Sequence, residues 1–171
     1  MAVYINTLNG GSITIGTGSS VLDPTKTRFT LQDGTVETYD ISGTLDQQWM
    51  IDNGYRNEWG EWVKTITQAE IGNTVTSIGG EYSPFNSCYA LTSVTIPDSV
   101  TFIGSLAFEW CSGLASVTIP DTVTTIEGSA FENCFGITSV TIIANGGNAA
   151  NVKQAMIDAG VPSNITWNMP S

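Results

Sequence analysis

The sequence LTSVTIPDSV at residues 91–100 decides the fold, because it returns 23 residues later as LASVTIPDTV at residues 114–123. A third start, ITSVTI at residues 137–142, follows at the same spacing. Apolar residues in the segment 66–78 fit the same frame, with two additional residues before Phe85. A fixed period of about 20–29 residues is typical of repeat solenoids, in which each unit packs on the next.

Each repeat contains a short strand, a tight Pro-Asp turn, a second extended piece and an irregular return through Ala and Phe. No single unit can bury its own apolar side, so the units stack and equivalent residues form ladders about 4.8 Å apart. Alternation along the strand predicts that Val94, Val117 and Val140 point inward, while their Ser and Thr neighbours point outward. We therefore predict a mainly β solenoid of 23-residue repeats over residues 66–142.

The full pattern is Leu-x-x-Val-x-Ile-Pro-Asp-x-Val-x-x-Ile-x-x-x-Ala-Phe-x-x-Cys, and two units match it almost everywhere. It resembles the bacterial surface-antigen type of leucine-rich repeat, the BspA-like or Treponema pallidum-type family, over about residues 66–142. This resemblance implies a short leucine-rich-repeat solenoid and a habit of binding proteins or cell surfaces. It implies no catalytic residues, because the family motif is structural.

The two flanks depart from the repeat. Residues 1–65 show strand patterns at 3–5 and 13–15 and a hairpin pattern at 29–39 that turns at Asp33 and Gly34. We predict a β-rich N-terminal module there, which attaches the protein to a larger assembly or to copies of itself.

The last segment, residues 143–171, predicts a helix over 149–159 that ends at Gly160, followed by a strand over 164–167. Because the end of a solenoid has to be covered, we interpret this helix and strand as a C-terminal cap.

Composition excludes several classes of function. There are 16 acidic residues against 5 basic ones, a net charge of -11, which excludes nucleic-acid binding because that affinity rests on Lys and Arg. Histidine is absent, which removes the commonest general base and metal ligand. We predict no enzyme activity, no catalytic residues, no cofactor and no metal site, although weak calcium binding stays open. No apolar run reaches the ~20 residues that membrane insertion requires.

Comparison of one repeat with the next indicates candidate partner contacts, because a core position keeps its apolar character in every unit. One repeat has apolar residues at three positions where the next repeat has polar ones: Phe102 corresponds to Thr125, Leu106 to Ser129 and Trp110 to Asn133. At a fourth position, Tyr89 and Phe135 stand where the repeat between them has Ser112. We predict surface contacts there, with packing against the flanking modules as the alternative. A further aromatic group is predicted to cover the first open turn; it comprises Trp49, Tyr55, Trp59 and Trp62.

The outward strand positions form a candidate hydroxyl face, which would bind saccharide or order water. The face comprises Ser93, Thr95, Ser116, Thr118, Ser139 and Thr141. The alternative is that Thr is simply a good residue for an exposed strand. The three cysteines, Cys88, Cys111 and Cys134, follow the repeat spacing, and we expect them to be buried packing residues.

These observations predict a non-catalytic structural or interaction protein that displays its solenoid on a particle surface. The setting we favour is a phage virion accessory protein, for decoration, fibre or host contact, because the first residues show no signal peptide. The alternative is an adhesin-like module on a bacterial cell surface, or outside the cell by a route not visible in the sequence. Its partner would be a host-surface protein or a glycan.

Overall fold

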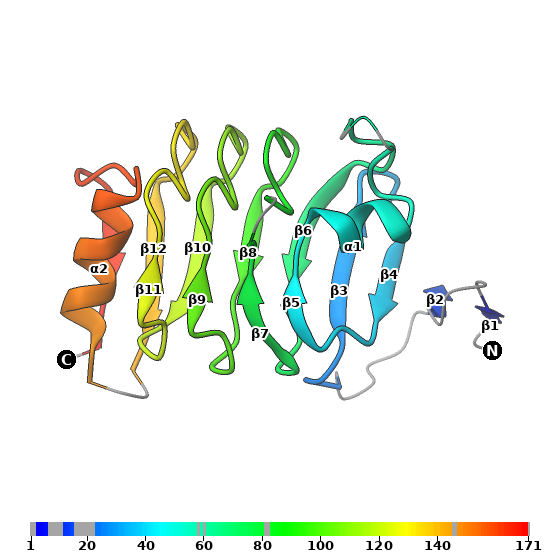
Figure 1. Cartoon of the computed structure of the whole chain (residues 1–171), viewed down its shortest axis with the longest axis horizontal. Helices are drawn as coiled ribbons and strands as arrows, with labels where there is room; N and C mark the ends of the chain where they lie inside the picture. The colour runs from blue at the N-terminus through cyan, green and yellow to red at the C-terminus, as the bar shows by residue number, and fades with distance from the viewer. Residues whose placement is uncertain are drawn as a thin grey trace.

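The computed structural model describes residues 23–57, 59, 61–80, 83–144 and 147–170, and the backbone of two earlier strands. Across these residues the chain winds into a β-solenoid of four turns, with the N-terminal segment at one end and a helix at the other (Figure 1). The predicted mainly β solenoid is confirmed.

The described residues form two sheets and two helices. The long sheet runs in the order β1 (Val3–Asn6), β2 (Ser12–Ile15), β4 (Val36–Tyr39), β3 (Thr27–Leu31), β6 (Ile66–Glu70), β8 (Ser93–Thr95), β10 (Ser116–Pro120), β12 (Ser139–Ile143) and β13 (Thr166–Asn168). The short sheet runs in the order β11 (Thr125–Ile126), β9 (Phe102–Ile103), β7 (Val75–Ile78) and β5 (Gly43–Leu45). The helices are α1 (Gln47–Asp52) and α2 (Ala149–Asp158).

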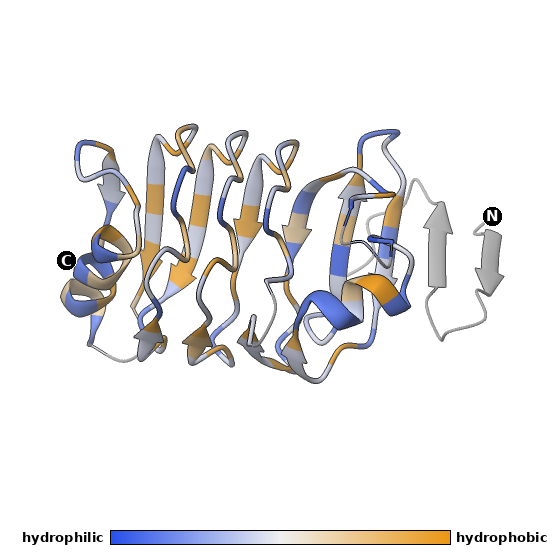
Figure 2. Ribbon diagram, turned by 45° about the horizontal axis from the view of Figure 1, so that its top comes forward, coloured by the Kyte–Doolittle hydropathy of each residue, from blue (hydrophilic) through white to orange (hydrophobic). Residues whose placement is uncertain are grey.

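The core lies between the two sheets and is built from ladders of equivalent residues. Parallel pairing of β10 with β8 and β12 places Val117 beside Val94 and Val140, and all three are buried. Hydrophobic residues accordingly recur at the same level on neighbouring strands (Figure 2). The rings of Phe85, Phe108 and Phe131 stack with successive centroids 5.1 Å apart. Each fully buried apolar side chain contributes about 1.5–3 kcal/mol, so these ladders dominate stability.

The N-terminal segment continues both sheets. The predicted hairpin is present as β3 and β4, and β3 pairs antiparallel with β6, while β5 pairs parallel with β7. The ring of Phe29 meets Phe85 edge-on at 6.0 Å, which extends the phenylalanine ladder by one aromatic residue. Residues 27–45 therefore cover the first repeat, and we call the described residues from 23 to 65 the N-terminal cap. The division of the chain into domains at residues 65 and 142 stays a prediction.

Two side chains of this cap donate the hydrogen bonds that, between repeats, come from the backbone of the preceding repeat. Between repeats, the carbonyl oxygen of Glu109 accepts a hydrogen bond of 2.7 Å from the backbone of Ser87, one turn earlier. The equivalent carbonyl, that of Asn86, has no repeat before it and accepts from the Arg56 guanidinium and, at 3.0 Å, from the Trp62 indole. The cap thus satisfies a partly buried acceptor that the solenoid would otherwise leave open.

The prediction that four aromatic residues cover the first turn holds for three of them. Tyr55 is buried, and Trp49 and Trp62 are half-buried against the core. Trp59 is 86% exposed, so its assignment to the cover is wrong. The side chain of Asn57 accepts hydrogen bonds from the backbone of Trp59 and Glu61, and this turn keeps Trp59 in a surface loop.

The C-terminal cap copies a repeat in the same manner. The Phe108 backbone donates to Ala130 at 2.8 Å, and the Phe131 backbone donates at 2.9 Å to Ala159, at the end of α2. The predicted helix and final strand are both present, and β13 pairs parallel with β12. Gly160 ends the helix with a φ of +108°, which favours glycine, and an added Cβ there would lie 2.8 Å from the Glu132 Cα. Neither described helix is long and apolar enough to cross a membrane.

Candidate functional site

Three loops stack along one edge of the solenoid, where each repeat passes from the short sheet back to the long one. They are residues 85–90, 108–113 and 131–136, and they lie along the upper edge of Figure 1. A Cβ on Gly113 would lie 2.3 Å from the Tyr89 carbonyl oxygen, and one on Gly136 would lie 2.5 Å from that of Ser112. The loops therefore pack so closely that only glycine fits between them.

An aromatic ridge runs along these loops. It consists of Tyr89, Trp110 and Phe135, which are 60%, 43% and 72% exposed. Trp110 and Phe135 come from adjacent loops and meet edge-to-face with ring centroids 6.3 Å apart. Large aromatic side chains held in this way on a surface are typical of contact residues.

The backbone conformation at Trp110, the central residue of the ridge, and at Leu106 is unfavourable for large side chains. Trp110 and Leu106 both have a φ of +60°, in the left-handed region. Their equivalents one repeat later, Asn133 and Ser129, adopt the same conformation. Small polar residues, asparagine above all, accept this region most readily, whereas bulky side chains are strained there. Folding alone therefore favours the polar residues of the later repeat over the apolar ones of the earlier repeat.

The other predicted contact residues lie apart from the ridge. Leu106 is 37% exposed in the turn that precedes the second loop. Phe102 lies on β9 of the short sheet, beside Ser77 of β7 and Thr125 of β11, and is half-buried. The structure thus brings Trp110 and Phe135 together and leaves Phe102 on a sheet face.

A small hollow adjoins the ridge at its N-terminal end. It has a volume of about 140 Å³ and is lined by Trp62, Thr65, Ile66, Ser87, Cys88, Tyr89 and Ala90. Ala90 occupies the position at which Gly113 and Gly136 stand in the later loops. Among the described residues, no repeat loop packs against residues 87–90 from the N-terminal side, so this position has room for a Cβ and for the hollow. Sequence comparison did not indicate the hollow, because it depends on the fold of the cap.

The candidate hydroxyl face forms in the predicted register. Ser116 pairs with Ser93 and Ser139, and Thr118 pairs with Thr95 and Thr141. The rows continue onto the flanking strands as Gln68 and Glu70 on β6 and Thr166 and Asn168 on β13. The Asn168 amide donates to the Thr141 hydroxyl at 3.2 Å, so a protein side chain already engages the last threonine of the row. A role of this face in saccharide binding or water ordering stays a prediction.

The cysteines are buried free thiols. Cys111 and Cys134 donate through Sγ to the carbonyl oxygens of Phe85 and Phe108, at 3.1 and 3.0 Å. Burial raises the pKa of the Cys88 thiol to about 12, which suppresses the reactive thiolate. Within the part of the chain that the structure describes, no three Cys, Asp or Glu side chains gather in a way that would hold a metal ion.

The N-terminal cap contains a charged cluster that no motif in the sequence indicated. The buried carboxylate of Glu37 accepts hydrogen bonds from Tyr55, from Tyr39 at 2.9 Å and from the Lys64 ammonium at 2.9 Å. Burial acts to raise the pKa of Glu37, but the three donors outweigh it and hold this pKa below its usual value. Burial also raises the pKa of Tyr39 to about 12, so this hydroxyl remains a donor at neutral pH.

We expect Glu37→Gln to lower the free energy of unfolding at neutral pH by about 1.5–3 kcal/mol, the range for hydrogen bonds to a charged group. Because the pKa of Glu37 is lower in the folded chain, its stabilisation is present above the unfolded value, near 4.5, and disappears as the pH falls through the folded value. Urea unfolding at several pH values should therefore show the gap between wild type and variant shrinking in acid. Asp98→Asn, at an exposed residue, is the control. A gap independent of pH would contradict the role of the carboxylate.

Comparison with protein families supplies the identity of the repeats. The model of the BspA-type leucine-rich repeat region, which describes six copies, matches residues 61–152, or 92 of the 171 residues. No curated protein and no solved structure matches the chain. Repeats of this type serve in general as non-catalytic interaction folds, typically in surface or extracellular proteins. With the match over more than half of its length and the repeat ladders present in the structure, the chain belongs to the BspA-type leucine-rich repeat family.

Proposed function

We propose that this protein is a non-catalytic interaction module that binds its partner through the aromatic ridge. The observation that carries the proposal is the backbone of Trp110, which holds a large exposed side chain at a φ of +60° where the next repeat uses Asn133. A bulky residue in this conformation costs roughly 1–2 kcal/mol relative to the right-handed region. Contact with a partner would explain why a tryptophan occupies position 110, where the backbone conformation disfavours it.

The hollow beside Tyr89 supports the same location. Tight contacts concentrate where an anchor side chain fills a pocket that neighbouring residues shield from water. A volume of about 140 Å³ suits one apolar side chain, and Trp62 and Tyr89 are among the residues that line it. The ridge and the hollow together form one continuous candidate surface along the loop edge.

Trp110→Asn copies the next repeat, and we expect it to leave thermal stability unchanged or slightly raised, because asparagine relieves the left-handed backbone. Binding of the partner should fall, because the variant removes the central ring of the ridge. The measurement is paired: thermal unfolding and partner binding for wild type and variant. A large loss of stability with unchanged binding would show that Trp110 serves the fold and would overturn the proposal.

Photo-crosslinking tests the location directly. A photoreactive phenylalanine analogue is placed at Phe135, which is 72% exposed on the ridge, and in a second protein at Ile143, which is 41% exposed at the end of β12. We expect a crosslinked partner from position 135 and none from position 143. Equal crosslinking from both positions, or from position 143 alone, would place the contact elsewhere.

We further propose the surface of a phage particle as the setting, with a bacterial cell surface as the second candidate. A compact acidic protein built mainly of β-strands suits decoration, fibre or host contact in a virion. Immunogold labelling with antibody to this chain separates the two settings. Label on particles released by lysis supports the virion, and label on intact cells supports the adhesin-like role.

Attachment to the assembly is proposed to involve residues 1–65. The described cap residues cannot be removed without exposing the first repeat, so the sharper test deletes residues 1–22 and keeps the chain from Asp23 onward. We expect this variant to keep its thermal unfolding transition and to lose incorporation into the assembly. Normal incorporation would show that residues 1–22 do not attach the protein to the assembly.

A further inference from the structure

We infer that the aromatic ridge binds a cationic segment of a protein partner, with Arg or Lys side chains lying over its exposed rings. The inference rests on the proposed function and adds the chemistry of the partner. It follows from two independent features, the distribution of charge and the use that the chain makes of its own cations.

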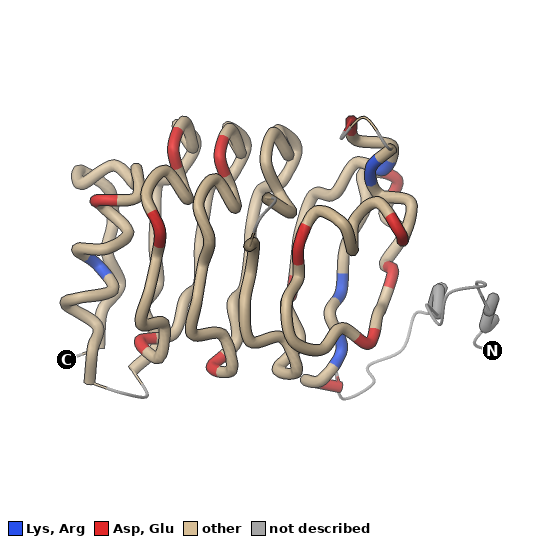
Figure 3. The backbone as a smooth tube through the Cα atoms, in the orientation of Figure 1, with Lys and Arg blue, Asp and Glu red and all other residues tan. Residues whose placement is uncertain are grey.

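The repeats carry charge of one sign only. Residues 65–152 contain seven Asp and Glu residues and no Lys or Arg. Acidic positions lie on both edges of the solenoid, including the loop edge, while basic ones are confined to the N-terminal cap and α2 (Figure 3). Two of the acids flank the centre of the ridge: Glu109 precedes Trp110, and the carbonyl of Glu132 accepts the Trp110 backbone N–H at 2.9 Å. A field of this sign attracts cations and repels anionic surfaces.

The chain's own cations are already engaged. All five lie in the described part of the chain, and three of them form ion pairs: Lys26 with Asp40, Arg28 with Glu70 and Lys64 with Glu37. Three lie over aromatic rings: Arg56 over Trp62 at 4.2 Å, Lys64 over Tyr55 at 4.6 Å and Lys153 over Trp167 at 5.2 Å. A cation that covers the rings of the ridge therefore has to come from another molecule.

The same observation argues against a second copy of this chain as the occupant. A second copy brings a net charge of -11 and cations that are already paired, so two ridges or their surroundings repel each other. A partner with exposed Arg or Lys side chains can form ion pairs with the carboxylates and cation–π contacts with the rings of the ridge. Arginine suits the ridge better than lysine, because its planar guanidinium stacks on aromatic faces and pairs with carboxylates in a bidentate geometry.

The test uses a short synthetic peptide of repeating glycine, arginine and serine, and a matched peptide in which neutral citrulline replaces each arginine. Binding to the full chain is measured by fluorescence anisotropy at low and at physiological salt. Trp110→Asn removes the central ring, Glu132→Gln removes a flanking charge, and Asp98→Asn removes one exposed charge in the Pro-Asp turn at the far end of β8. The peptides are accompanied by a neutral oligosaccharide as a third probe.

We expect the arginine peptide to bind wild type and the citrulline peptide not to bind. Trp110→Asn should weaken binding of the arginine peptide about tenfold, equivalent to 1.4 kcal/mol, and Glu132→Gln should weaken it more than Asp98→Asn does. If the two charge variants weaken binding equally and Trp110→Asn has no effect, the overall negative charge of the protein alone explains peptide binding, and the inference is overturned. Failure of the arginine peptide to bind would overturn it as well.

Two further outcomes separate this inference from the proposed function. Binding of the neutral oligosaccharide that Trp110→Asn abolishes, without arginine-dependent peptide binding, would make the ridge a glycan site; the inference would fail and the proposed binding surface would stand. Absence of any crosslink from position 135 to the natural partner would instead overturn the proposed function, whatever the peptides do.

Discussion

Replacing Ile119 by alanine is expected to lower the free energy of unfolding by about 2–5 kcal/mol, the range for large-to-small substitutions in a core. Ile119 lies on β10, is fully buried and pairs in register with Ile142 of β12. It also continues the ladder from Ile96, so the alanine variant leaves a cavity between two neighbouring rungs. Because each strand is hydrogen-bonded to the strands of the neighbouring turns, the surrounding residues can move only partly into this cavity.

Ile143→Ala is the matched control for this substitution. Ile143 is the last residue of β12, directly after Ile142, but it is 41% exposed. The same chemical change there should alter stability by less than about 1 kcal/mol, since little apolar surface leaves water. Urea unfolding of both variants measures the difference. Equal effects at the two positions would contradict the assignment of Ile119 to the inner ladder.

Replacing Gly72 by proline is expected to destabilise the protein by about 3 kcal/mol or more, although proline is what the repeats carry at this place. Gly72 occupies the position of Pro97 and Pro120 in the Ile-Pro-Asp turns. A Cβ at residue 72 would lie 2.3 Å from the carbonyl oxygen of Thr25. The Gly72 backbone N–H also donates to the buried hydroxyl of Thr27 at 2.9 Å, and proline has no N–H to offer.

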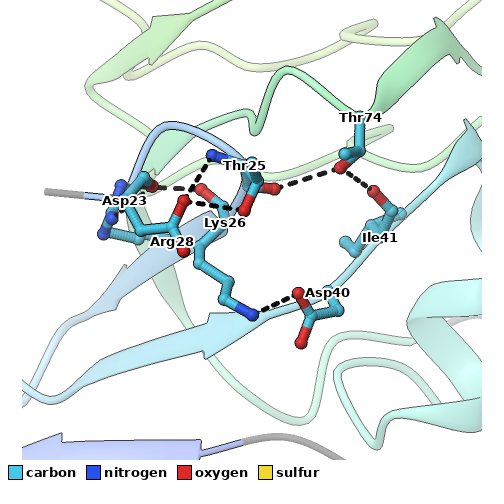
Figure 4. Close-up of polar contacts among 7 residues, drawn as sticks. All are labelled: Asp23, Thr25, Lys26, Arg28, Asp40, Ile41 and Thr74. Atoms are coloured by element: carbon cyan, nitrogen blue, oxygen red, sulfur yellow. Dashed lines mark hydrogen bonds and ion pairs between the residues drawn. The ribbon is translucent and has the colours of Figure 1, made fainter.

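The segment that Gly72 meets cannot easily move aside. The Thr74 hydroxyl donates to the carbonyl oxygens of Thr25, at 3.0 Å, and of Ile41, and the Asp23 carboxylate accepts from the backbone and hydroxyl of Thr25 (Figure 4). An ion pair between Lys26 and Asp40 adds a further link across the same group (Figure 4). The clash therefore has to be relieved by separating the N-terminal cap from the first repeat.

Two alanine variants separate the causes. Gly72→Ala keeps the N–H and adds only the Cβ, so we expect it to destabilise less than proline but clearly more than the control. Gly128→Ala is that control, because a Cβ there has open space around it and its φ is not positive. Thermal and urea unfolding give the order of stability. A Gly72→Pro variant as stable as wild type would show that the cap does not pack as described.

Recurrence at a fixed offset was sufficient to identify the core and to indicate candidate surface residues. A repeat places equivalent residues in equivalent environments. A position that is apolar in every repeat is therefore expected to be buried, and a position that is apolar in only one repeat is expected to lie on the surface. Val117 is an example of the first, and Trp110 beside Asn133 is an example of the second. The exposed state of Trp110 and Phe135 agrees with this reasoning, whereas Phe102 is half-buried on β9, between Ser77 of β7 and Thr125 of β11.

The repeat pattern did not predict the contacts at the two ends of the solenoid, because each of them joins a repeat to a segment that does not repeat. Asp98 and Asp121 are equivalent in sequence, yet Asp98 is exposed while Asp121 is buried and accepts the Asn148 backbone N–H at 3.1 Å. Gly72 differs from its proline equivalents for the same reason, since Thr25 of the N-terminal cap, a segment outside the repeats, packs directly against it.

The periodicity of the chain thus determined the ladders, the register and the loop edge, since all of these are contacts at one repeated offset. Packing of the folded chain determined the rest: the Glu37 and Lys64 pair, the substitution of Arg56 and Trp62 for a missing repeat, and the hollow beside Tyr89. These features depend on how two non-repeating segments meet the first and last turns. A one-dimensional pattern contains no distance between such segments, and only the three-dimensional arrangement supplies it.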